Sequence, residues 1–226
     1  MILIVGALLG GFLQSVLCQV HPQFGHVALC DQAGGLAAIH EPSINLVIWR
    51  RQIKPELVFS IDQASYNELP AERSLINFHY NMRIDQTGWH ELLRGEVEEL
   101  TKVFRSYTNC GRASAVGYRD RGSICSSLRQ GIAQKFHRDS VGSYRMLTTW
   151  RGPGTEWLPE QRHLKERWEG PNYFISRFPV QQLLRGEVML MRGGVMGATI
   201  FHRSPRLAWG SLRLVTVFDP LRGIVV

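Results

Sequence analysis

The chain has 226 residues, of which 44% are hydrophobic and 20% charged, and these proportions are ordinary for a globular protein. The length suits one domain with a helical extension, and the absence of internal repeats excludes a repeat architecture. The net charge is +7, yet only four of the 26 basic residues are lysines. The arginines are scattered rather than gathered in a stripe, which disfavours a nucleic-acid-binding surface.

The first 17 residues are nearly all apolar, and the first charged side chain is Asp31. A secretory signal normally begins with positive charge, which is missing here, so we expect a cytoplasmic protein with an apolar lead-in or a misplaced start codon. Export through a weak signal is the alternative, because Val16-Leu17-Cys18 could act as a cleavage site. The apolar run is short and interrupted by glycines, so no transmembrane span is expected.

The spacing of the four cysteines predicts neither a zinc knuckle nor a redox pair. No two of them are spaced as C-x-x-C, and so few cysteines in a chain of this size do not predict a disulfide framework. They are Cys18, Cys30, Cys110 and Cys125.

The N-terminal half predicts few strands. Residues 1–40 lack clear periodicity and are expected to be irregular. The first strand is predicted at Asn45–Trp49, and Pro55 ends that unit. Helices are predicted at Glu56–Asn67 and Trp89–Tyr107, the second with an apolar stripe at helical spacing that ends before Asn109 and Gly111. Its members are Leu92, Leu93, Val97, Leu100, Val103, Phe104 and Tyr107.

Beyond Gly111 the pattern changes to short apolar or alternating runs separated by glycine and proline, which predicts a β-sandwich or barrel. These runs are 115–118, 134–139, 144–150, 173–176, 187–191, 198–202 and 212–219. The charged segment 160–169 is predicted to be a flap. We therefore expect an irregular segment 1–40, a strand and helical extension 41–114, and a β core 115–226, which is a mainly β fold with a helical N-terminal part (α+β).

His137 and Asp139 share one face of a predicted strand, because residues two apart in a strand point the same way. His202 follows on a later strand. Two histidines and one carboxylate on one face are typical of a site that holds Fe(II) and leaves positions open for oxygen chemistry. The alternative is that His137 and Asp139 merely hydrogen-bond each other while His202 caps a turn. The other six histidines share no ligand spacing.

Arg213 lies on the apolar strand 212–219, where it shares a face with Val215 and Val217. If that face is interior, the arginine is a buried cation that requires an anion, and a carboxylate is the natural partner. The alternative is an arginine that extends to solvent and pairs with a structural Asp or Glu.

His137-x-Asp139, His202 and Arg213, in this order, resemble the Fe(II)/2-oxoglutarate-dependent dioxygenases of the double-stranded β-helix fold. The resemblance covers residues 115–220 and includes Gly154-Thr155-Glu156-Trp157, where such enzymes often carry a Gly-x-Thr segment. It implies a jelly-roll (cupin-like) barrel, with His137, Asp139 and His202 as catalytic iron ligands. It also implies that Arg213 binds 2-oxoglutarate and that Trp150, Trp157 and the flap border the substrate entrance.

The strings 135–139 and 149–159 more closely resemble an uncharacterised bacterial domain-of-unknown-function family, and this resemblance reaches back to 45–51. Its members are often encoded beside zinc-homeostasis genes. Arg138 departs from the pattern, which is expected to have an uncharged or apolar residue there. A cupin-like protein that holds zinc without redox chemistry is therefore one alternative, and a basic nucleic-acid-binding β-domain is another. The substrate, a small molecule or a protein, has no motif of its own.

Overall fold

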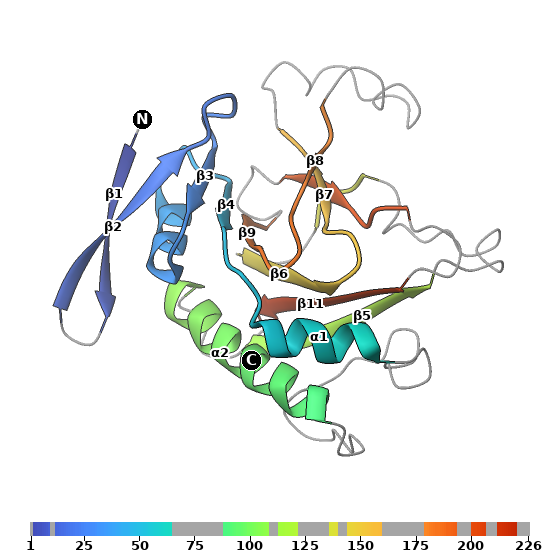
Figure 1. The fold of residues 1–226 in the computed structure, drawn as a ribbon. Coiled ribbons are helices and arrows are strands. Elements are labelled where there is room, and N and C mark those ends of the chain that lie inside the picture. The colour runs from blue at the N-terminus through green and yellow to red at the C-terminus, as the bar shows by residue number, and fades with distance from the viewer. Residues whose placement is uncertain are drawn as a thin grey trace, which may run out of the picture.

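The structure is a computed structural model that describes residues 2–9, 12–64, 88–108, 113–121, 136–139, 144–159, 179–193, 200–206 and 212–220. These residues form a mainly β fold with two sheets and a few helices (Figure 1). None of the helices in these parts of the chain is both long and apolar enough to cross a membrane.

The larger sheet has eight strands in the order β1-β2-β3-β4-β9-β6-β11-β5, and all neighbours are antiparallel except β3 and β4. Its strands are β1 (Ile2–Leu9), β2 (Phe12–Val20), β3 (Val27–Cys30), β4 (Leu46–Trp49), β5 (Ala113–Arg121), β6 (Tyr144–Arg151), β9 (Val188–Arg192) and β11 (Leu212–Pro220). The smaller sheet has the order β10-β7-β8, with β7 (Glu156–Leu158), β8 (Gln181–Gln182) and β10 (Phe201–Arg203). Within the described ranges the two sheets do not close into a barrel.

Three helices cover one face of the large sheet: the 3₁₀ helix η1 (Ala33–His40) and the α-helices α1 (Pro55–Gln63) and α2 (Gly88–Thr108) (Figure 1). Pro55 occupies the first turn of α1, where its missing N–H costs no hydrogen bond. The predicted stripe of α2 is buried at Leu93, Val97, Leu100, Phe104 and Tyr107. Phe104 packs against Phe218 of β11 with ring centroids 6.2 Å apart, which anchors the helix to the sheet.

A second apolar core lies on the opposite face of the large sheet. Alternate residues of the central strands divide between the two cores, so that in β6 Met146 faces the helices while Leu147 faces the second core. A sheet buried on both faces needs nearly continuous apolar strands, which explains the composition of β4, β9 and β11. Trp157 of the small sheet and Ile200 contribute to this second core. The face of the large sheet opposite the helices therefore lies toward the small sheet, and we call it the inner face.

Trp150 lies on the helix side of the large sheet, and the expectation that it borders a substrate entrance is wrong. The indole is fully buried, its Nε1–H donates to Thr216 Oγ1 at 2.8 Å, and the Arg51 guanidinium lies 5.3 Å from the ring centroid. Trp157 is also buried, but on the side of the small sheet.

The predicted elements around 46–49, 88–108, 113–121, 144–151, 188–192, 201–203 and 212–220 are confirmed, and α1 agrees with the prediction up to Gln63. Residues 1–40 differ from the prediction, because β1, β2, β3 and η1 lie there. The strand predicted at 134–139 is only a single bridge at His137 within the described part. The flap 160–169 and the strand 173–176 lie outside the described residues, and the division at residue 115 stays a prediction.

Candidate metal centre

His137 and His202 are held opposite each other by the backbone. They form an antiparallel bridge in which each backbone N–H donates to the carbonyl oxygen of the other at 3.0 Å. Opposed residues of such a pair project their side chains to the same face, and here the ring centroids lie 4.6 Å apart. His202 belongs to β10, where it pairs with Trp157 of β7. The small sheet therefore positions the bridge.

Asp139 adds a carboxylate to the two imidazoles. His202 Nε2 lies 3.0 Å from Asp139 Oδ2, and His137 Nε2 lies 3.6 Å from Asp139 Oδ1. One donor atom from each of the three residues lies within 4.8 Å of the others. The side chain of His202 is 6% exposed and that of Asp139 is 10% exposed, so the cluster is largely shielded from water.

The hydrogen bonding around His202 leaves its Nε2 facing the carboxylate. Nδ1 lies 3.2 Å from the carbonyl oxygen of Ile200, which can only accept, so Nδ1 carries the proton. In the neutral ring Nε2 is then a bare acceptor that faces Asp139 Oδ2. That oxygen is buried and lies 3.0 Å from Nε2. Two acceptors this close require a positive charge between them, which a proton or a metal ion supplies.

Arg145 holds the other oxygen of the same carboxylate, because its Nη1 lies 2.6 Å from Asp139 Oδ1. Burial would by itself raise the pKa of Asp139, but the contacts with His202, Arg145 and His137 outweigh it and lower the pKa to about 2. The carboxylate is therefore ionised at neutral pH, as a metal ligand must be. Its two oxygens have different neighbours: Oδ1 faces Arg145 and, at a longer distance, His137, whereas Oδ2 faces His202.

The residues present fit a divalent metal ion. Two imidazole nitrogens and one carboxylate oxygen suit Fe(II) and Zn(II) alike. The backbone carbonyl behind His202 and the guanidinium behind Asp139 are the kind of outer partners that orient metal ligands. The chain therefore brings together the three predicted ligands, and metal binding by them stays a prediction.

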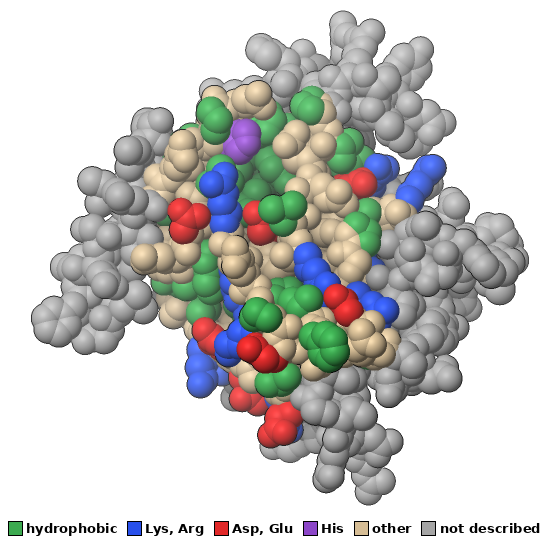
Figure 2. Space-filling model, in the orientation of Figure 1, with side chains coloured by type: hydrophobic (Ala, Val, Ile, Leu, Met, Phe, Trp, Pro, Cys, Tyr) green, Lys and Arg blue, Asp and Glu red, His purple; other side chains and the backbone are tan. Residues whose placement is uncertain are grey.

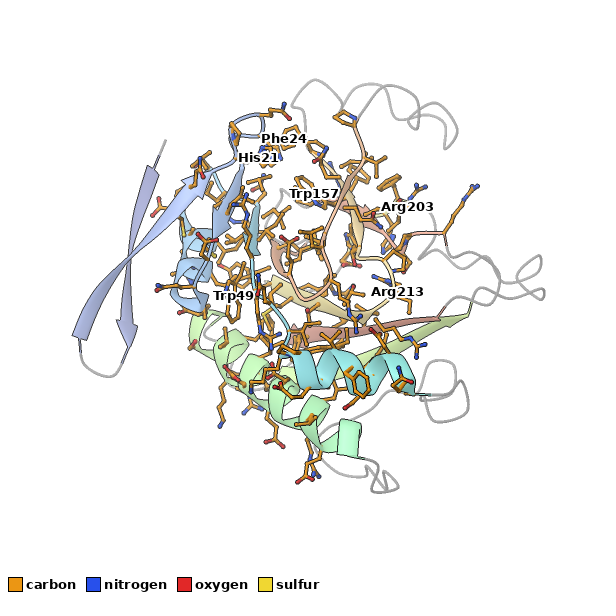
Figure 3. The ribbon with its side chains drawn as sticks, viewed as in Figure 1. His21, Phe24, Trp49, Trp157, Arg203 and Arg213 are labelled. Atoms are coloured by element: carbon orange, nitrogen blue, oxygen red, sulfur yellow. The ribbon has the colours of Figure 1, made fainter. Side chains whose placement is uncertain are left out.

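Arg213 is 2% exposed, so the face of β11 that carries it is interior. Of the two alternatives from the sequence, this agrees with the buried cation and not with an arginine that extends to solvent. Its Nε donates to the Pro153 carbonyl at 2.9 Å, Nη1 to Ser204 Oγ at 3.1 Å, and Nη2 to the hydroxyls of Thr155 at 2.8 Å and Thr149 at 3.4 Å. Ser204 is two residues beyond His202, so the guanidinium lies beside the end of β10. Figure 3 shows Arg213 on the same side of the molecule as Arg203 of β10.

The face of the bridge opposite the ligands carries two crossed cation–π contacts. The Arg203 guanidinium lies 4.2 Å from the centre of the Phe136 ring, and that of Arg138 lies 4.1 Å from the Phe201 ring. Arg203 also pairs with Glu156 of β7 through Nε and Oε2 at 2.5 Å. Arg138 points away from the ligands, and its contact with Phe201 provides a local reason for a charge at that position.

The sequence interpretation missed Arg145 and the oxygens around Arg213. Arg145 could have been found, because it lies two residues before Leu147 and so shares the inner face of β6 with it. Among the residues the structure describes, no second group of three His, Cys, Asp or Glu side chains could hold a metal. His40, for example, is in contact with the Tyr144 hydroxyl at 3.2 Å. His79 and His163 lie outside the described residues.

Comparison with solved structures finds only distant similarity. A full-length Neurospora crassa protein in complex with alpha-KG has a TM-score of 0.43 and 12% identity over 84% of this chain and 80% of that chain. The C-terminally truncated apo form of the same protein has a TM-score of 0.47 and 11% identity over 84% and 89%. AviO1 from Streptomyces viridochromogenes Tue57 has a TM-score of 0.40 and 16% identity over 78% and 90%.

Sequence comparison assigns the chain to a family. No curated protein has a significantly similar sequence. The family model described as "Protein of unknown function (DUF1826)" matches residues 30–219, which is most of the chain. This agrees with the resemblance to a domain-of-unknown-function family noted from the strings 135–139 and 149–159. The chain therefore belongs to the DUF1826 family.

Proposed function

We propose that this protein is an Fe(II)- and 2-oxoglutarate-dependent oxygenase whose metal ligands are His137, Asp139 and His202. The observation that carries the proposal is the convergence of two imidazoles and a buried carboxylate, whose ligand atoms lie within 4.8 Å of one another, with Asp139 Oδ2 3.0 Å from Nε2 of His202. A metal ion held here would be bound by one nitrogen of each histidine and one oxygen of Asp139, which lie on the same face of the bridge. When bound, iron with 2-oxoglutarate and dioxygen supplies the oxidising chemistry that hydroxylates a C–H bond, with succinate and carbon dioxide as coproducts.

The chain's own residues orient the side chains of the proposed metal ligands. The Ile200 carbonyl sets the tautomer of His202, and Arg145 holds Oδ1 of Asp139, which leaves Oδ2 beside Nε2 of His202. Three protein ligands would leave other positions of a bound ion open for a chelating keto acid and oxygen. The apolar core between the sheets limits access of water on the side of Trp157 and Ile200.

Arg213 is the proposed anchor for the distal carboxylate of 2-oxoglutarate. The guanidinium is buried, and the hydroxyls of Thr149, Thr155 and Ser204 with the Pro153 carbonyl fix the plane of its fork. These contacts use four of the five N–H groups, so a carboxylate would bind through Nη1 and replace a longer contact, such as that with Thr149 at 3.4 Å. As part of the same proposal, the two sheets represent a double-stranded β-helix core, with residues 115–226 contributing the site.

The alternative is a protein that holds zinc at the same ligands without redox chemistry, since the donor set suits both metals. Nucleic-acid binding is less well supported. Figure 2 shows acidic and basic side chains interspersed on the visible face, and the described side chains there form no continuous basic stripe. A steep dependence of nucleic-acid binding on salt would be needed to support that function.

The test begins with metal content. Purified under anaerobic conditions and loaded with Fe(II), the protein should bind one iron, and His137→Ala, Asp139→Ala and His202→Ala should each abolish stoichiometric binding. His40→Ala is the matched control, because this histidine contacts Tyr144 instead. If all three ligand variants keep the metal content of the unaltered chain, the site is elsewhere.

The cosubstrate then decides the class. Anaerobic addition of 2-oxoglutarate to the iron-loaded protein should produce a weak charge-transfer band in the visible spectrum, and air should bleach the band and release succinate. Arg213→Ala should keep iron but weaken 2-oxoglutarate binding by about 2–5 kcal/mol, because one partner of a buried charged pair is removed. A folded, iron-loaded protein with neither band nor succinate would instead support the zinc-type, non-redox function.

A further inference from the structure

Cys18 and Cys30 lie directly opposite each other on neighbouring strands. They are register partners in the antiparallel pairing of β2 with β3, and they are 0% and 2% exposed. Opposed residues in such a ladder have Cα atoms about 4.5–5.5 Å apart, and disulfides span Cα separations of about 4.4–6.8 Å. The backbone therefore provides the spacing of a disulfide, although both cysteines are free thiols.

The two sulfurs share one small space beneath η1. The Cys18 thiol donates to the carbonyl oxygen of Gly35 at 3.2 Å, so in the hydrogen bond between the two cysteines the Cys30 thiol is the donor. A Cβ atom at Gly35 would lie 2.7 Å from Cys18 Sγ and 2.8 Å from Cys30 Sγ. Only glycine at this position leaves room for both sulfur atoms.

The hydrogen bond gives the two thiols different chemistry. The contact with Cys30 lowers the pKa of the Cys18 thiol, although burial and the nearby Asp31 oppose this effect. The same hydrogen bond, together with burial, raises the pKa of the Cys30 thiol. Cys18 is thus the better nucleophile of the pair, and Cys30 stays protonated until it attacks the oxidised Cys18.

We propose that Cys18 and Cys30 form a dithiol site that hydrogen peroxide oxidises to an intramolecular disulfide. The Cys18 thiolate attacks one peroxide oxygen, the O–O bond breaks, and a sulfenic acid and hydroxide form. The Cys30 sulfur then attacks Cys18 Sγ, the S–OH bond breaks, and the Cys30 proton leaves with hydroxide as water. Two thiols are oxidised by two electrons in total, and the peroxide is reduced to water.

The disulfide would link the hairpin of β1 and β2 covalently to β3. β1 is the edge strand and pairs in the sheet with β2, while β2 joins the rest of the sheet through three residue pairs, of which Cys18 with Cys30 is one (Figure 1). Both cysteines belong to the core on the helix side of the large sheet, away from the metal cluster. The inference is therefore independent of the proposed oxygenase function.

The experiment uses the full chain with Cys110→Ser and Cys125→Ser, so that only the pair remains. After treatment with hydrogen peroxide, denaturation and alkylation, intact mass should show loss of two hydrogen atoms and no alkylated thiol. Peptide mapping should join the peptides that contain Cys18 and Cys30. A disulfide that closes the loop between Cys18 and Cys30 should raise the melting temperature by about 5–10 °C, and dithiothreitol should reverse the increase.

Cys30→Ser in the same background is the control. Peroxide should then add oxygen to Cys18 without raising the melting temperature. If this variant does not fold, the comparison of oxidised and reduced protein in the parent background decides by itself. The proposal is overturned if peroxide leaves both thiols open to alkylation, if it adds oxygen atoms to Cys18 while Cys30 is present, or if the disulfide links two chains.

Discussion

The metal-free protein should lose a defined part of its stability in acid through Asp139. A pKa lowered from 3.8 to about 2 corresponds to about 2 kcal/mol of unfolding free energy. Because the folded-state pKa lies below the unfolded-state value, this contribution is present above about pH 4 and is lost as the pH falls through about 2. The side chain is 10% exposed, so screening by water reduces this contribution little.

The comparison that isolates this contribution is between the unaltered chain and Asp139→Asn. Urea unfolding is followed by tryptophan fluorescence with EDTA present, at several values between pH 5 and pH 2, where carboxyl groups are the side chains that normally titrate. The difference in unfolding free energy should be largest at pH 5 and should shrink by about 2 kcal/mol toward pH 2. Other carboxyl groups titrate in both proteins and cancel in the difference.

Asp62→Asn is the control, because this aspartate pairs with Arg185 at a half-exposed position, where an ion pair contributes little. Its effect should be small at every pH. A difference between the unaltered chain and Asp139→Asn that stays constant from pH 5 to pH 2 would refute the reasoning. It would mean that the contacts with His202, Arg145 and His137 do not favour the ionised carboxylate.

Three further substitutions test separate parts of the structure. Arg145→Met should weaken metal binding by about 10- to 100-fold in a competition assay with a coloured chelator, because it removes the partner of Asp139 Oδ1; unchanged affinity would mean that Arg145 does not orient the ligand. Phe104→Ala should lower the unfolding free energy by about 3–5 kcal/mol, since the ring is 1% exposed, yet leave metal affinity of the folded protein unaltered. A loss of metal affinity there would show that the two faces of the large sheet are coupled. Gly186→Ala should cost about 1–3 kcal/mol in urea unfolding because its φ is +88°, and a neutral result would mean that the turn can relax.

Much of the architecture follows from local patterns in the sequence. The apolar stripe of α2 has helical spacing. β9 and β11 are largely apolar runs and β6 mixes apolar with threonine and arginine residues, each bounded by glycine or proline, so their type could be predicted from the chain. The same reasoning predicted that Arg213 shares a face of the strand with Val215 and Val217, and all three side chains are buried. Residues 1–40 could not be predicted in this way. Their strands are stabilised by pairing with neighbours, and short apolar runs have no distinctive period.

The candidate site was determined in part by the sequence, because the spacing of His137 and Asp139 places both on one face of an extended segment. The partners that complete it depend on the tertiary structure. The pairing of His137 with His202 depends on register between distant segments, and the opposition of Cys18 and Cys30 depends on the register of β2 with β3. The contact of Arg145 with Asp139 depends on how residues 136–139 lie against β6. A slip of one residue in any of these pairings would turn the side chains to the opposite face, and local periodicity contains no information about which register forms. The pairing of β10 with β7 in the small sheet fixes His202 opposite His137, and β6 in the large sheet carries Arg145, so the site exists only once both sheets are assembled.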